Sequence, residues 1–86
     1  MIIKKKCWPE WFRKILSGDK NFDYRLADFD ISPGDTLVLE EWNPETKEYT
    51  GRAVSKTVKY VSRTKSQAWW NPEEVSEKGF VIMGFE

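Results

Sequence analysis

The sequence of 86 residues contains no histidine and a single cysteine, Cys7. Without histidine, neither a Cys/His zinc site nor histidine-based acid–base catalysis is available, and we expect no metal and no cofactor. One cysteine forms no intramolecular disulfide, and no apolar stretch is long enough to enter a membrane or to resemble a signal peptide. We therefore expect a cytoplasmic protein in a reducing compartment, with no membrane partner.

A strong excess of positive charge is also missing, because 14 basic residues balance 14 acidic ones. The chain therefore lacks the bulk charge that holds many proteins to nucleic acid. The basic residues nevertheless gather in two segments, residues 1–18 with five basic and one acidic side chain, and residues 49–65 with five basic and none acidic. If these segments are neighbours in the fold, they form a positive face that suits a phosphate-bearing partner.

Aromatic residues are abundant for so short a chain, with five Trp, five Phe and three Tyr. A core of this size needs fewer rings for packing, which predicts that some rings are exposed for stacking. Trp8, Trp11 and Trp42 lie singly on amphipathic segments and are expected to pack. Trp69 and Trp70 are adjacent on an irregular segment, and their side chains cannot point the same way in an extended chain, so one of them is expected to be exposed.

The pattern of turns and apolar residues predicts a single domain over residues 1–86. The expected elements are an edge strand at 2–7, a helix at 9–17, strands at 22–26, 36–42 and 52–62, a short helix at 72–78 and a last strand at 80–85. Short strands with turn signals and one substantial helix favour an α+β fold built as a small mixed β-barrel of about five to six strands.

Three finer expectations concern which side chains are buried. Trp11, Phe12, Ile15 and Leu16 form a helical stripe that we expect to pack on the core. The near-continuous apolar run at 80–85 predicts a strand buried on both faces. In residues 52–62 the change of parity between Tyr60 and Val61 predicts a bulge or a bend.

The stretch from Gly18 to Asp35 interleaves polar and apolar residues most tightly. Alternation over residues 22–26 predicts a strand with Phe22, Tyr24 and Leu26 on a buried face, and with Asp23 and Arg25 together on a polar face. Lys20 lies at the corner between helix and strand. These three charged residues are either a solvated surface with a weak ion pair or a ligand site.

Three separated motifs carry a resemblance to a known family. They are W-P-E-W-F at 8–12 with I-L-S-G at 15–18, the pattern Gly18, Lys20, Asp23, Arg25, and L-V-L-E-E-W-N-P-E-T-K-E-Y-T-G-R at 37–52. The chain resembles the ASCH superfamily, in particular its short stand-alone prokaryotic and phage members of unassigned function, whose signature G-x-K-x-x-E-x-R has Asp23 in place of glutamate here. The resemblance implies a PUA-like β-barrel with a cleft beside Lys20 that binds RNA or a nucleotide.

These observations favour a monomeric RNA- or nucleotide-binding module. The residues expected to bind are Lys20, Asp23, Arg25, Arg52, Trp69 and Trp70. Lys20 and Arg25 are expected to contact phosphate or a base edge, Asp23 to accept from an exocyclic amine or to orient Arg25, and a tryptophan to stack on a base.

The alternative is a hydrolase acting on a modified nucleoside or on RNA, with Lys20 and Asp23 as the catalytic pair. Some ASCH proteins are amidohydrolases on acetylated cytidine, in which the signature lysine activates a threonine three residues later. Asp23 takes the threonine position and has no proton for Lys20 to remove. The hydroxyl nucleophile of these amidohydrolases is therefore replaced by a carboxylate, which weakens the hydrolase hypothesis. A third possibility is an interaction protein whose cleft binds no ligand.

Overall fold

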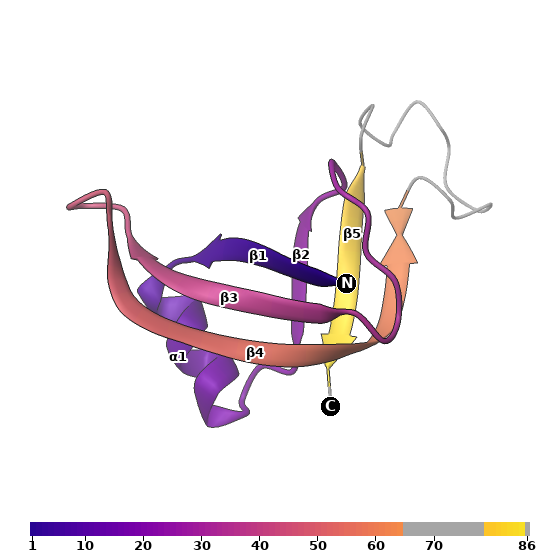
Figure 1. The fold of residues 1–86 in the computed structure, drawn as a ribbon, viewed down its shortest axis with the longest axis horizontal. Coiled ribbons are helices and arrows are strands. Elements are labelled where there is room, and N and C mark those ends of the chain that lie inside the picture. The colour runs from indigo at the N-terminus through magenta and orange to yellow at the C-terminus, as the bar shows by residue number, and fades with distance from the viewer. Residues whose placement is uncertain (65–78, 86) are drawn as a thin grey trace.

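The computed structural model describes residues 1–64 and 79–85. Its elements are β1 (Ile2–Cys7), α1 (Pro9–Ser17), β2 (Phe22–Leu26), β3 (Thr36–Asn43), β4 (Glu48–Arg63) and β5 (Phe80–Phe85). Within these residues, the strands form a five-stranded sheet in the order β1-β3-β4-β5-β2 (Figure 1). The pair β1/β3 is parallel and the other pairs are antiparallel. The predicted α+β class is confirmed, whereas the short helix predicted at 72–78 lies outside the described residues.

The long strand β4 joins the two parts of the sheet. Its first part pairs with β3 and its last part with β5, and the register shifts between Val58 and Tyr60. Figure 1 shows β4 curving, so that β5 stands steeply against β1 and β3. The predicted bulge or bend is confirmed by the register shift between Val58 and Tyr60, and Val58 is fully buried while Tyr60 is exposed. The strand order leaves β1 and β2 as its two edges.

Helix α1 begins and ends as its sequence predicts. Pro9 occupies the first turn, and Gly18 follows the last turn in the left-handed conformation, with φ 88°, that costs glycine little. The predicted apolar stripe is only half right, because Phe12 and Ile15 are buried while Trp11 and Leu16 are exposed. Positions three apart share one face of a helix, and this short helix turns one narrow face toward the sheet.

The core consists of apolar side chains from every element but β2. Its buried members are Cys7, Phe12, Ile15, Ile31, Leu37, Leu39, Val58, Val81, Met83 and Phe85. The prediction that β5 is buried on both faces is wrong, since Phe80 and Ile82 are exposed. Strand β5 lies between β4 and β2, and only one of its faces meets the core.

Strand β2 has the predicted alternation with its two faces exchanged. Asp23 is buried and Arg25 is half-buried, whereas Phe22, Tyr24 and Leu26 are exposed. The predicted buried face is therefore wrong. A period of two determines which side chains share a face but does not determine which face meets the core. The inward charges of β2 are tolerated because they are paired with each other and with the backbone of β1.

Candidate functional site

A cleft of about 720 Å³ lies where the end of α1 meets β2. Its lining joins aromatic and charged side chains from β1, α1, β2 and β3. The rings are those of Trp8, Trp11, Phe22, Tyr24 and Trp42, the cations are Lys6, Lys14, Lys20 and Arg25, the carboxylates are Asp19 and Asp23, and Cys7 completes the lining. This volume falls in the range of small-molecule sites, which are commonly about 300–1,000 Å³.

The turn after α1 places Lys20 in this cleft. Gly18 ends the helix and donates its N–H to the carbonyl oxygen of Ile15 at 3.2 Å. The N–H of Lys20 then donates to the carbonyl oxygen of Lys14 at 3.0 Å. These bonds hold the corner against the last helical turn, so that the Lys20 side chain leaves the backbone beside β2.

Lys20, Asp23 and Arg25 are the charged side chains of the lining that are not exposed, and we call them the floor of the cleft. Arg25 Nε donates to Asp23 Oδ2 at 2.7 Å, and Lys20 Nζ lies 3.8 Å from Asp23 Oδ1. Their side chains are 13%, 8% and 23% exposed for Lys20, Asp23 and Arg25. The structure thus brings together the three charged residues that the sequence singled out, and their low exposure distinguishes them from a solvated surface pair.

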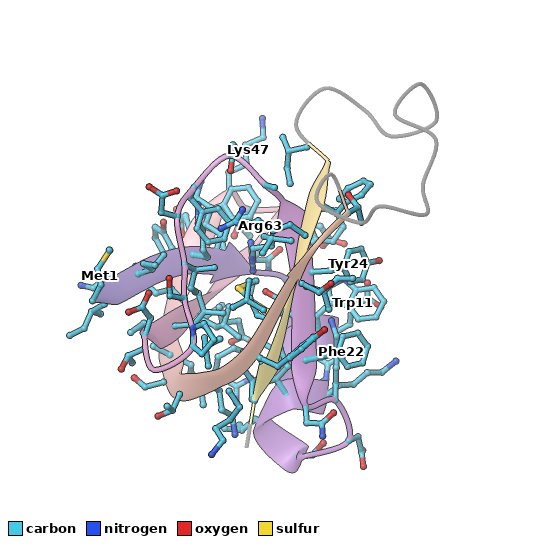
Figure 2. The ribbon with its side chains drawn as sticks, turned by 90° about the vertical axis from the view of Figure 1, so that its right-hand side faces the viewer. Met1, Trp11, Phe22, Tyr24, Lys47 and Arg63 are labelled. Carbon is cyan, nitrogen blue, oxygen red and sulfur yellow. The ribbon has the colours of Figure 1, made fainter. Side chains whose placement is uncertain are left out.

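Lys20 is also enclosed by aromatic rings. Its Nζ lies 5.0 Å from the ring centre of Trp11, 5.3 Å from that of Phe22 and 5.8 Å from that of Tyr24. Figure 2 shows these three side chains gathered on one side of β2. An ammonium group within about 6 Å of a ring centre is attracted by the ring face. The exposed face of β2 therefore supplies two of the three rings around Lys20, and α1 supplies the third.

The three tryptophans of the cleft differ in whether a cation lies over the ring. Lys6 Nζ lies 4.5 Å from the ring centre of Trp42, and Lys14 Nζ lies 5.2 Å from that of Trp11. Trp8 is 50% exposed, and no cation of residues 1–64 and 79–85 lies over its ring. Trp8, Trp11 and Trp42 were expected to pack. Trp8 and Trp11 are exposed, Trp42 is half-buried, and all three line the cleft.

Arg52, which the sequence grouped with the binding residues, does not line the cleft. It forms a two-bond pair with Glu41, with Nε and Nη2 each donating at 2.9 Å, and its guanidinium lies 5.0 Å from the ring centre of Phe12. These bonds, followed by one from the Thr50 hydroxyl at 2.6 Å, hold the pKa of Glu41 below its ordinary value. Trp69 and Trp70, also named from the sequence, lie outside the described residues.

The remaining chemistry of the cleft is limited. Burial raises the pKa of the Cys7 thiol, and the nearby Asp23 carboxylate raises it further, so the thiol is protonated at neutral pH. In the part of the chain that the structure describes, no group of three His, Cys, Asp or Glu side chains could hold a metal ion. No helix in that part is long and apolar enough to cross a membrane.

The two basic segments of the sequence contribute unequally to the cleft. Lys6 and Lys14 come from the first segment, and Lys20 lies two residues after its end. In the sheet, β3 separates the strand of the first segment from that of the second. The positive charge of the cleft therefore comes from β1, the end of α1 and β2, and no residue of the second segment is among the described lining.

These features define a small α+β domain with a cleft of mixed cationic and aromatic character. Over residues 3–85 the chain matches a family model described as Domain of unknown function (DUF3850). The chain belongs to this family. A search of curated proteins found no match.

Proposed function

We propose that the chain is an RNA- or nucleotide-binding module whose ligand enters the cleft at the corner between α1 and β2. The observation that carries the proposal is the composition of the cleft, with five aromatic side chains and four cations against two carboxylates. Single-stranded nucleic acids are bound by this combination, in which cations meet the phosphates and rings stack on the bases. We also propose that the chain is related to the ASCH superfamily and forms a PUA-like barrel. The cleft beside Lys20 is the feature that supports this relationship.

Trp8 is the best candidate for stacking on a base. Trp11 and Trp42 each have an ammonium group over the ring, and Trp11 also helps to enclose Lys20. Trp8 is half exposed within the same cleft, and no described cation covers it. A base that stacks on Trp8 contributes about 1–3 kcal/mol to binding.

Binding accounts for the geometry of Asp23 better than hydrolysis does. The Asp23 carboxylate is buried and accepts a short hydrogen bond from Arg25. A carboxylate engaged in this way orients two cations and presents little surface to a substrate. We therefore assign Asp23 the role of orienting Lys20 and Arg25, and Lys20 the role of contacting the ligand.

The proposal is tested by fluorescence anisotropy of labelled single-stranded RNA. Trp8→Ala removes the stacking ring, and Tyr60→Ala removes an exposed ring on β4 that does not line the cleft. We expect Trp8→Ala to weaken binding about tenfold, in line with the loss of one stacked base, and Tyr60→Ala to leave it unchanged. Equal affinities for the two variants would refute a stacking role for Trp8, and no binding by the wild-type protein would refute the function.

A further inference from the structure

The charges at the floor of the cleft do not balance. Two cations, Lys20 and Arg25, share the single carboxylate of Asp23 at 3.8 Å and 2.7 Å. All three side chains are largely removed from solvent, so the floor holds one excess positive charge where water compensates it poorly. A buried or half-buried charge is costly unless an opposite charge accompanies it.

No other group of the described lining neutralises this excess. The Cys7 thiol is protonated at neutral pH because burial, and then Asp23, raise its pKa. Asp19 is exposed and accepts a hydrogen bond from the Ser17 hydroxyl at 3.2 Å, and the lining also contains two further cations, Lys6 and Lys14. The whole lining thus has four cations and two carboxylates, which favours an anionic ligand group.

The enclosure of Lys20 restricts which anion can reach it. Three rings surround its Nζ, and the side chain is only 13% exposed. An internal phosphodiester carries a nucleoside on each side, and both nucleosides would have to enter the cleft with it. A terminal phosphate hangs from a single ester bond and can extend to the floor while its base stays near the surface.

We propose that the floor binds one terminal phosphate group, with Lys20 as its principal contact and the attached base on Trp8. This inference rests on the proposed function and narrows the ligand to a phosphomonoester, supplied either by a free nucleotide or by the end of a strand. Arg25 contributes charge but is already engaged with Asp23 and with the backbone of Lys6. Charge-assisted hydrogen bonds from an ammonium to a phosphate are short and strong.

Calorimetric titration of the wild-type protein tests this inference with a nucleoside, its 5′-monophosphate and the methyl ester of that monophosphate. We expect the monophosphate to bind about tenfold more tightly than the nucleoside, and the methyl diester to lose most of that advantage. The advantage should grow as the pH rises through about 6, where the phosphomonoester gains its second charge. Comparison with 5′-phosphorylated and unphosphorylated oligonucleotides then shows whether the phosphate belongs to a strand end.

Lys20→Gln tests the residue, and Lys47→Gln in the β3–β4 turn is the matched control for losing one lysine charge. We expect Lys20→Gln to abolish the preference for the monophosphate over the nucleoside, and Lys47→Gln to keep that preference. Lys20→Arg retains the charge and should keep the preference. It is the variant to measure if Lys20→Gln does not fold. Equal binding of nucleoside and monophosphate by the wild type would overturn the inference and leave the proposed function standing. Failure of every probe, single-stranded RNA included, would overturn both.

Discussion

Arg25 donates a hydrogen bond from Nη2 to the backbone carbonyl oxygen of Lys6 at 2.6 Å. Since Lys6 lies on β1 and Arg25 on β2, the bond joins the two edge strands of the sheet order. The same guanidinium also holds Asp23 at 2.7 Å. Arg25 therefore connects the two edge strands and positions the Asp23 carboxylate at the same time.

Replacing Arg25 is expected to destabilise the fold. Arg25→Met removes both hydrogen bonds and leaves the buried Asp23 carboxylate with only the longer Lys20 contact. We expect a loss of about 2–3 kcal/mol in the free energy of unfolding, measured by urea denaturation. Arg13→Met on the exposed face of α1 is the control, with a change of less than about 0.5 kcal/mol. Equal losses in the two variants would show that the connection between the edges contributes nothing.

Asp23→Asn tests the electrostatic account of the floor. Asparagine keeps the size of the side chain and can still accept from Arg25, but it removes the only carboxylate at the floor. We expect the free energy of unfolding to fall by about 1–3 kcal/mol and the affinity for single-stranded RNA to rise, because the excess positive charge at the floor increases. The two quantities are measured by urea denaturation and by anisotropy. A weaker complex would contradict the electrostatic account of the floor.

The pair Glu41–Arg52 predicts a pH dependence of stability. Hydrogen bonds from Arg52, and then from Thr50, hold the pKa of folded Glu41 below its ordinary value of 4.5. As the pH falls, the unfolded chain takes up this proton first, so the stabilising contribution is complete above about 4.5 and is lost as the pH passes through the lower folded pKa. Glu41→Gln should therefore be less stable than the wild type at neutral pH. The difference should shrink in acid, as followed by urea denaturation across pH, and a difference that stays constant would contradict this assignment.

The corner that delivers Lys20 depends on Gly18. Its φ of 88° is unfavourable for other residues, although an added Cβ would meet nothing within 4 Å. Gly18→Ala is therefore expected to cost about 1–2 kcal/mol through backbone conformation alone. Gly84→Ala is the control, since its Cβ would make an ordinary contact with Tyr60 at 3.5 Å and its φ needs no left-handed conformation. Thermal unfolding of both variants measures the difference, and a stable Gly18→Ala protein would argue against the strained turn.

Local signals were sufficient to predict the limits of α1 and the turns. Pro9 at the start and Gly18 at the end act through their own backbone preferences, which is why the helix lies where it was expected. The bulge in β4 followed in the same way from the change of parity at Val61. These features depend on a few neighbouring residues and need no knowledge of the rest of the fold.

The orientation of β2 could not be predicted locally. Its inward face was set by a partner 19 residues away, the backbone carbonyl of Lys6, which satisfies Arg25. With Asp23 and Arg25 turned inward, Phe22 and Tyr24 became available to surround Lys20. The exposed rings of the cleft were therefore missed because their exposure follows from a contact between distant strands.

Arg52 illustrates a signal that was present in the sequence but overlooked. Glu41 shares the face of Leu37 and Leu39, so a buried carboxylate was implied on β3 and required a cation. Arg52, on the neighbouring strand of the hairpin, is that cation. Because Arg52 is the last residue of the third motif of the ASCH resemblance, it was grouped with the ligand-binding residues instead.

The central claim is most directly tested by an NMR titration with short single-stranded RNA that follows the indole N–H signals of the tryptophans. We expect the signals of Trp8 and Trp11 and the backbone signal of Lys20 to shift together, while that of Tyr60 stays in place and the RNA remains intact over hours. Absence of shifts at the cleft, or shifts confined to the face that carries Tyr60, would contradict the account. New RNA fragments that accumulate with time would show a hydrolase in place of a binding module.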